Sequence, residues 1–253
     1  MSIRGFSPDR PTIGTRLTLA DPAVAEIMAA AGFEWLVVDL EHSLLTLETA
    51  GELIRVIELC GASPLVRLTS NDSDQIKRVM DGGAHGIIVP MVLSADDAAK
   101  AVAATRYPPA GTRGVGLGRA QRYGAGFEEY LSWQVDGPII IVQIEHRDSV
   151  ANLEAILAVP GIGGFIIGPY DLSASMGIPG QFDDPVFLEC METIRSTARR
   201  MGVPSGIHLV EPDVAALRQA VADGYSLIAY GVDFRFLDVT ARLGVSAMRE
   251  LLS

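Results

Sequence analysis

Short β-rich runs alternate with alanine-rich segments of helical periodicity along the whole chain. The predicted strands are residues 12–19, 35–40, 64–68, 86–90, 138–144, 163–167, 203–208 and 226–231. The predicted helices are residues 22–31, 47–59, 73–81, 95–105, 148–157, 185–201, 211–222 and 234–252. Because a helix follows every strand, the pattern contains eight strand–helix units.

The predicted strands are apolar on both faces, which is typical of parallel strands covered by other elements on each side. Runs such as GIIVP, IIIVQI and GFIIG have this character. Eight units in 253 residues match a closed (β/α)8 barrel, the TIM barrel, and an open doubly wound sheet is the alternative. No linker or low-complexity tract divides the chain, so we predict one domain over residues 1–253.

Several predicted helices begin with a residue that caps well. Asp21 precedes Pro22, which suits the first helical turn, and Ser73 and Ser94 stand at the start of two later helices. Glycine follows the predicted ends of others, as at Gly202.

One connection, residues 106–135, is too long for a simple link and carries no clear strand. It contains Arg106, Arg113, Arg119 and Arg122 in a chain that is otherwise strongly acidic. Its glycines do not form a GxGxxG dinucleotide loop, because Arg119 takes the place of the last glycine. A solvated loop and a functional loop are both open interpretations.

The charge balance excludes some partners. Twenty basic and 31 acidic residues give a formal charge of −11, which would repel a nucleic-acid backbone. Cys60 and Cys190 lie far apart without metal-binding spacing, and no segment has the apolar length of a membrane span or secretion signal. We therefore expect a cytoplasmic protein with no nucleic-acid or membrane partner.

In a barrel of this type, reactive groups come from the carboxyl ends of the strands. The polar residues predicted there are Asp39, Glu41, His42, Arg67, Gln143, Glu145, Asp171 and Asp233. Glu145 and Asp171 follow neighbouring strands, and two carboxylates with open positions suit Mg²⁺ or a similar ion. The alternative is that each acid caps a helix.

His42 lies three residues after Asp39, a spacing that resembles a base and its orienting carboxylate. Arg67 ends an apolar strand, where a guanidinium needs a partner, and it is suited to hold an anion or a developing oxyanion. His85 is interpreted as structural, whereas His146 and His208 stand at the predicted mouth.

Blocks along nearly the whole chain resemble the HpcH/HpaI family of class II pyruvate aldolases. They are AGFEWLVVDLEH, VRLTSND, IIVPMV, ATRYPPAGTRGVG, VQIEHRDSVANL, GPYDLSASMG and YGVD, in this order. Several blocks in the right order make a more specific signal than any one motif.

The resemblance implies roles for individual residues. Glu145 and Asp171 match the metal-binding acids, His42 the catalytic base oriented by Asp39, and Arg67 the arginine at the keto or enolate oxygen. The residues that match the pyruvate site or border the substrate entrance are Gln143, Gly168, Pro169, Tyr170 and Arg113.

The implied reaction is the reversible cleavage of a 4-hydroxy-2-oxo acid to pyruvate and an aldehyde. A divalent cation (Mg²⁺, Mn²⁺ or Co²⁺) would stabilise the pyruvate enolate. The family also implies a homohexamer, a trimer of dimers that exchange the last helix. A Schiff-base aldolase would need a lysine in the pocket, and the only two, Lys77 and Lys100, fall on predicted outer helices.

Three residues depart from the family pattern and bear on the aldehyde partner. Arg16 stands where an aromatic residue is common, His146 where threonine is usual, and His208 where an apolar residue is common. Together they favour a polar or anionic aldehyde. Other interpretations remain: a decarboxylase similar to macrophomate synthase, a lyase for acyl-CoA substrates, or a barrel without catalytic activity.

Overall fold

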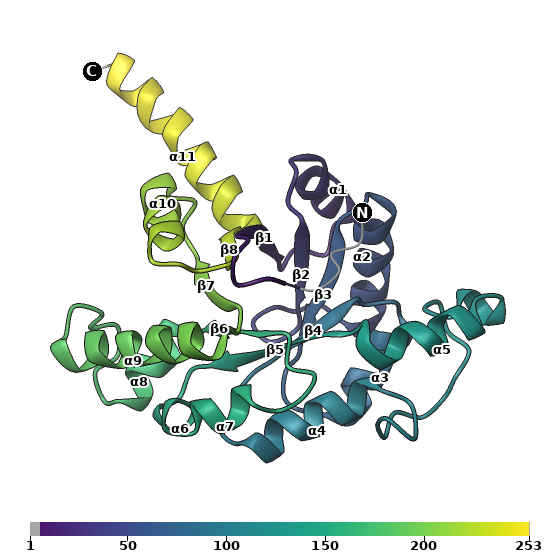
Figure 1. Cartoon of the computed structure of the whole chain (residues 1–253). Coiled ribbons are helices and arrows are strands. Elements are labelled where there is room, and N and C mark those ends of the chain that lie inside the picture. The colour runs from purple at the N-terminus through teal and green to yellow at the C-terminus, as the bar shows by residue number, and fades with distance from the viewer. Residues whose placement is uncertain (1–5, 253) are drawn as a thin grey trace.

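Eight parallel strands pair in sequence order and close on themselves in the computed structural model, which describes residues 6–252 (Figure 1). They are β1 Thr12–Leu17, β2 Trp35–Asp39, β3 Ser63–Arg67, β4 Gly86–Val89, β5 Ile139–Ile144, β6 Gly164–Ile167, β7 Ser205–Leu209 and β8 Leu227–Val232. The (β/α)8 barrel is therefore confirmed, and the hydrogen-bonded pairing of β1 with β8 excludes an open sheet.

Helices surround this ring of strands (Figure 1). They are α1 Pro22–Ala30, α2 Leu47–Leu59, α3 Ser73–Asp81, α4 Ala95–Thr105, α5 Phe127–Asp136, α6 Arg147–Ala151, α7 Leu153–Leu157, α8 Pro169–Ser175, α9 Pro185–Met201, α10 Val214–Ala222 and α11 Asp233–Leu251. A short 3-10 helix, η1, covers Arg122–Gly124.

The inside of the barrel is a packed core. Trp35, Val37, Leu65, Ile88, Ile141 and Ile166 are among the side chains that fill it. Gly14 leaves room for the Trp35 ring, because a Cβ atom at this glycine would lie 2.0 Å from the ring. These side chains fill the barrel interior, so a ligand site is expected at the carboxyl ends of the strands, above this core.

Side chains cap several helices, with one difference from the prediction. Asp21 accepts a hydrogen bond from the backbone of α1, and Ser94 caps α4, as predicted. The cap of α3 is Asp72 rather than Ser73, since the Asp72 carboxylate accepts the backbone N–H of Asp74 at 2.9 Å.

Three segments differ from the predicted elements. The long connection contains α5, whose cap Gly126 offers no side chain to signal its start. The helix predicted over residues 148–157 divides into α6 and α7 at Asn152, whose side chain donates to the Leu93 carbonyl at 2.8 Å. Between the strand predicted to end at residue 167 and the helix predicted from residue 185, the structure has the additional helix α8, with Pro169 in its first turn.

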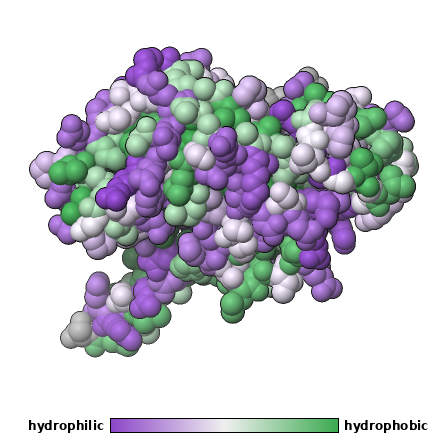
Figure 2. Space-filling view, turned by 90° about the horizontal axis from the view of Figure 1, so that it is seen from below, coloured by the Kyte–Doolittle hydropathy of each residue, from purple (hydrophilic) through white to green (hydrophobic). Residues whose placement is uncertain are grey.

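The helix α11 projects from the barrel and carries exposed apolar residues (Figures 1 and 2). Leu237, Leu243, Val245, Met248 and Leu251 are each more than half exposed. In Figure 2, polar and apolar residues are mixed over the lower face of the molecule. No helix within residues 6–252 is long and apolar enough to span a membrane.

Candidate active site

A polar layer covers the apolar core at the carboxyl ends of the strands and lines a cavity of about 300 Å³. Its walls include Arg16, Asp39, Arg67, Gln143 and His208, together with residues 168–171. These side chains belong to strands that are far apart in sequence, and the closed barrel brings them together. The strand-end rule applied to the sequence therefore located this cavity.

Arg67 binds two carboxylates in the polar layer. Its Nε atom donates to Oδ1 of Asp39 at 2.9 Å, and its NH2 group donates to Oδ2 of the same carboxylate. Its NH1 group lies 2.9 Å from Oε2 of Glu41. The side chains of Arg67 and Asp39 are almost fully buried, so this is a desolvated, two-point ion pair.

The same pairing shifts two pKa values in opposite directions. Burial alone would raise the pKa of Asp39, but the hydrogen bond and charge of Arg67 hold it below its usual value. Burial raises the pKa of Glu41 to about 7 against the opposing charge of Arg67, and the charges of Glu145 and Asp39 add to the increase. Glu41 thus exchanges a proton near neutral pH.

His42 lies at the rim of the cavity, and its ring does not pair with Asp39 as the sequence predicted. The carboxylate of Asp39 is bound to Arg67, and its contact with His42 is to the backbone N–H, which it accepts at 3.3 Å beside that of Glu41 at 3.0 Å. The ring Nε2 of His42 lies 4.0 Å from Oε2 of Glu41, and the side chain is 64% exposed. Glu41 is therefore the carboxylate that neighbours the histidine ring.

Glu145 is buried at the end of β5, next to the cavity. Its Oε1 accepts the backbone N–H of Met91 at 2.7 Å, and its Oε2 accepts the side-chain amide of Gln143. Met91 has a φ of 52°, so a strained backbone directs this N–H. Gly168 lies directly against the carboxylate, because a Cβ atom there would be 2.9 Å from Oε2.

The oxygen atoms on this side of the cavity fit a hard divalent cation. Asp171 lines the cavity from the first turn of α8, and β5 and β6 are adjacent strands. Oε1 of Gln143 is buried without a hydrogen-bond partner in the described chain, which leaves an oxygen donor beside Glu145. Within residues 6–252, no group of three His, Cys, Asp or Glu side chains forms a ready metal site. Two carboxylates and an amide oxygen suit an ion that also takes water and substrate oxygens.

Other predicted residues divide between the cavity and structural contacts. Pro169 and Tyr170 line the cavity, and the Tyr170 ring lies edge-on to Phe182. Asp233, expected among the strand-end groups, is fully buried, and backbone N–H groups bind its carboxylate. His146 caps α6 through its Nδ1 atom.

The structure does not bring Arg113 to the cavity. Its guanidinium donates to the Thr105 carbonyl at 3.0 Å and to the Tyr130 hydroxyl at 2.8 Å. The guanidinium carbon also lies 4.3 Å from the centre of the Tyr107 ring. These contacts link residues within the long connection to the end of α4, away from the cavity.

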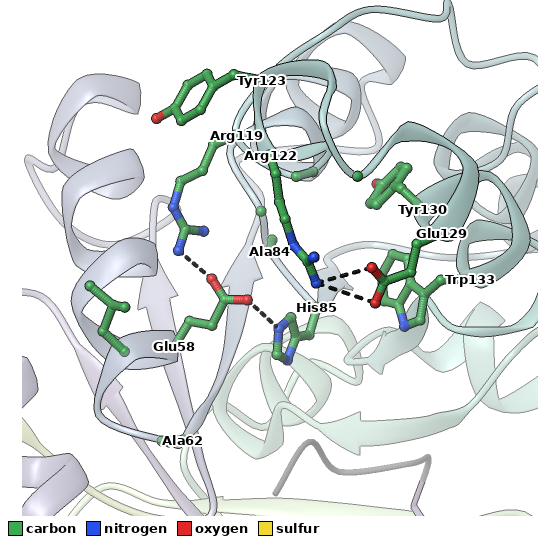
Figure 3. A pocket seen from close by; sticks show the side chains of 15 residues that line it. Glu58, Ala62, Ala84, His85, Arg119, Arg122, Tyr123, Glu129, Tyr130 and Trp133 are labelled. Carbon is green, nitrogen blue, oxygen red and sulfur yellow. Dashed lines mark hydrogen bonds and ion pairs between the residues drawn. The ribbon is translucent and has the colours of Figure 1, made fainter.

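A larger hollow of about 710 Å³ lies beside the amino-terminal ends of β3 and β4 (Figure 3). Glu58 pairs there with His85 at 3.5 Å and with Arg119, and Arg122 pairs with Glu129 at 3.1 Å. In the described chain, none of the predicted site residues lines this hollow. The charged side chains of this hollow are paired with one another. The cavity at the carboxyl ends of the strands is smaller, but it contains most of the predicted site residues and is the better active-site candidate.

Comparisons with known proteins identify the family of this chain. The sequence profile of the family described as HpcH/HpaI aldolase/citrate lyase matches residues 13–238. The chain belongs to this family. It is 41% identical over 243 residues to the 4-hydroxy-2-oxo-heptane-1,7-dioate aldolase of Salmonella typhimurium, which covers 93% of this chain and 91% of the relative.

Solved structures of family members superpose closely on the barrel. A family protein from Burkholderia cenocepacia has a TM-score of 0.90 at 33% identity, covering 95% of each chain. An HpcH/HpaI aldolase from Desulfitobacterium hafniense has a TM-score of 0.87 at 33% identity, covering 95% of this chain and 93% of the other. The expected enzyme class, a carbon–carbon lyase of the aldolase type, is confirmed for this member of the HpcH/HpaI family.

Two features of the site were not predicted from the sequence. Nothing marked Met91 as a donor to Glu145, because its role depends on a backbone N–H and a left-handed φ. Glu41 was given no role, although its place in the Asp-x-Glu-His motif was a signal. Lys77 and Lys100, as predicted, lie on the outer helices α3 and α4, where they bind Asp74 and the Asn71 carbonyl.

Proposed function

We propose that this chain catalyses the reversible, metal-dependent aldol cleavage of a 4-hydroxy-2-oxo acid to pyruvate and an aldehyde. The observation that carries the proposal is the composition of the cavity. Asp171 lines the cavity after β6, and Glu145 is buried beside it after β5. The buried pair of Arg67 and Asp39 lies at the ends of β2 and β3. His42, at the rim, is within the same cavity.

Glu145 and Asp171 are proposed to hold the cation, which is Mg²⁺, Mn²⁺ or Co²⁺. A bound divalent cation would act as a Lewis acid toward the 2-oxo acid, a stabilisation worth several kcal/mol. Oε1 of Gln143 is the further oxygen available next to Glu145. Gly168, Pro169 and Tyr170 would line the pyruvate half, where the missing side chain of Gly168 leaves space.

The other groups of the chain would handle charge and the proton. Arg67 is already held by Asp39, so it presents a fixed positive charge to the oxygen that becomes negative during cleavage. His42 is proposed to take the proton from the C4 hydroxyl, since its ring is in the cavity and accessible. Glu41, 4.0 Å from that ring, is the neighbouring carboxylate.

The test is an aldol assay with pyruvate and a panel of aldehydes in the presence of each cation. We expect adduct formation that disappears after exhaustive treatment with EDTA and returns when the cation is added back. Undiminished activity after EDTA treatment would contradict the metal assignment. Pyruvate release from oxaloacetate without an adduct from any aldehyde would instead identify a decarboxylase.

The proposal extends to the assembly and its setting. We propose that residues 1–253 form one catalytic domain that assembles as a homohexamer, a trimer of dimers, in the cytoplasm. The exposed apolar residues of α11 support an assembly in which this helix packs against a second copy of the chain. Light scattering after size-exclusion chromatography tests this, and a monomeric full-length protein would contradict it.

A further inference from the structure

Arg16 places a buried guanidinium at the active-site cavity. The residue lies on β1, lines the active-site cavity and is only 7% exposed. Its Nε atom has no hydrogen-bond partner within residues 6–252. A buried charge normally has a counter-charge, because removing it from water is costly. The cavity therefore presents a guanidinium to which no carboxylate of the described residues is directly bound.

The acids around the cavity bind other groups. Asp39 and Glu41 both pair with Arg67. Asp233 is next to β1, but its Oδ2 accepts the backbone N–H groups of the two residues that follow this strand, at 2.7 and 2.8 Å. None of these three acids forms a hydrogen bond or an ion pair with Arg16, and the charges of Asp39, Glu41 and Glu145 act on its guanidinium only from beyond ion-pair distance.

The backbone around Arg16 is shaped to hold it in this position. The pairing of β1 with β8 shifts register between Gly14 and Arg16, a bulge of the kind that redirects a side chain. Across this bulge, the Gly231 carbonyl accepts the Thr15 hydroxyl at 3.2 Å and lies 3.1 Å from Nε2 of His208. Gly231 has a φ of 70°, which this arrangement requires.

Arg16 lies across the cavity from the proposed cation site. In a closed ring of eight strands, β1 is opposite β5, which ends next to Glu145. Burial and the charge of Arg67 lower the pKa of Arg16 to about 9, so the guanidinium remains charged at neutral pH. Burial lowers the pKa of His208 well below its usual value, so its imidazole is neutral. Among the cavity-lining residues in or directly after β7, β8 and β1, Arg16 is therefore the one that carries a positive charge.

We propose that Arg16 binds a carboxylate on the aldehyde half of the substrate and selects aldehydes that carry one. The inference rests on the proposed function, because it assumes that the pyruvate half occupies the side of Glu145 and Asp171. A substrate held there extends across the cavity toward β1, where its far end meets the unpaired guanidinium. A carboxylate at that end supplies a directly bound counter-charge and a two-point hydrogen bond.

The experiment compares two aldehydes of the same carbon skeleton, 4-oxobutanoate and its neutral methyl ester, in the aldol reaction with pyruvate and Mg²⁺. Wild type is expected to prefer the anion, and Arg16→Met is expected to lower the ratio of the two kcat/KM values about 100-fold. Arg16→Lys, which keeps the charge but loses the planar fork, should retain part of the preference. Arg55→Met removes an exposed arginine on α2 and serves as the control for lost charge, with an unchanged ratio.

The outcomes separate this inference from the proposed function. An unchanged ratio of the two kcat/KM values in Arg16→Met would overturn the inference about Arg16. If both values fell by the same factor, this unchanged ratio would assign Arg16 to the pyruvate half. No adduct from wild type with either aldehyde would overturn the proposed function instead. In that event, the increase in melting temperature that succinate produces decides the role of Arg16. An increase lost in Arg16→Met supports anion binding, and an equal increase in both proteins overturns it.

Discussion

The Nε atom of Arg67 donates to Oδ1 of Asp39 at 2.9 Å, inside a barrel mouth where both side chains are almost fully buried. A buried pair that loses one partner leaves an uncompensated charge, which typically costs about 3–5 kcal/mol. We therefore expect Asp39→Asn to lower the free energy of unfolding by about 3 kcal/mol, since Glu41 still neutralises part of the charge. Urea unfolding measures the change.

A double-mutant cycle with Arg67→Met distinguishes pairing from independent roles. If the two side chains stabilise each other, Asp39→Asn costs much less in the Arg67→Met background, and the coupling energy exceeds about 1 kcal/mol. Additive effects within about 0.5 kcal/mol would contradict the pairing. The same variants should raise KM for pyruvate, because the position of Arg67 depends on Asp39.

The pair of Arg67 and Asp39 shows which features of this site can be predicted from the sequence. Strand periodicity and the strand-end rule located Asp39, His42, Arg67 and Gln143 at the mouth, and all four line the cavity. The spacing of Asp39 and His42 suggested a pair. The carboxylate of Asp39 instead binds Arg67, because the long arginine side chain extends to it from the neighbouring strand. The Cα atoms of Asp39 and Arg67 are register partners of β2 and β3, which sequence spacing within one strand does not reveal.

The fold was predictable for a related reason. Apolar strands and amphipathic helices repeat their periods over many residues, so the eight units of the barrel are visible in the sequence. Local irregularities leave a weaker signal. The start of α5 at Phe127 has no capping side chain, and the break at Asn152 depends on a hydrogen bond to a carbonyl 59 residues away in sequence.

Glu145→Gln should abolish metal-dependent turnover without unfolding the protein. The new amide would place an NH2 group near the Gln143 amide, but Gln143 can rotate so that its unpartnered Oε1 accepts from it. We expect the free energy of unfolding to change by less than about 1.5 kcal/mol and cation binding to be lost. Calorimetric titration with Mn²⁺ and urea unfolding check the two parts separately. Cation affinity equal to wild type would refute the assignment of Glu145.

Asp171→Asn tests the second proposed cation ligand, whose side chain is exposed. Asp171 lies in the first turn of α8, so its replacement removes little buried structure. Weaker Mn²⁺ binding with an unchanged melting temperature is the expected result. Exposed Asp148, in the first turn of α6, provides a matched control, because Asp148→Asn should leave cation affinity as it is.

His42→Ala should reduce kcat strongly and leave pyruvate binding intact. The His42 side chain is 64% exposed, so its removal costs little stability, and its proposed role is to move a proton. A loss of about 100-fold or more in kcat is expected for a general base. Steady-state kinetics in the cleavage direction, with KM for pyruvate measured in the condensation direction, separate the two effects. A raised KM with normal kcat would show that His42 positions substrate instead.

Gly231→Ala should destabilise the barrel more than a glycine substitution that meets only backbone strain. At Gly231, φ is 70° and a Cβ atom would lie 2.2 Å from the Phe236 ring. Gly224 has a φ of 87° with nothing within 4 Å of a Cβ atom, so Gly224→Ala isolates the strain. We expect Gly231→Ala to cost at least about 1 kcal/mol more than Gly224→Ala. Equal costs in urea unfolding would mean that the Phe236 ring moves aside freely.

Low pH should weaken the contacts that Glu58 makes with His85 and Arg119, beside the amino-terminal ends of β3 and β4. The hydrogen bond from His85, followed by the hydrogen bond and charge of Arg119, lowers the pKa of Glu58 to about 2 from an ordinary value of 4.5. Because the folded-state pKa is the lower one, the carboxylate stabilises the fold fully above pH 4.5, and this contribution is lost as the pH falls toward about 2.

Glu58→Gln should therefore lower the free energy of unfolding at pH 7, and its difference from wild type should shrink between pH 4.5 and pH 2. Glu52→Gln, an exposed change on the same helix, is the control for the loss of one carboxylate. A difference between wild type and Glu58→Gln that stays constant over this range would show that packing, rather than charge, accounts for the role of Glu58.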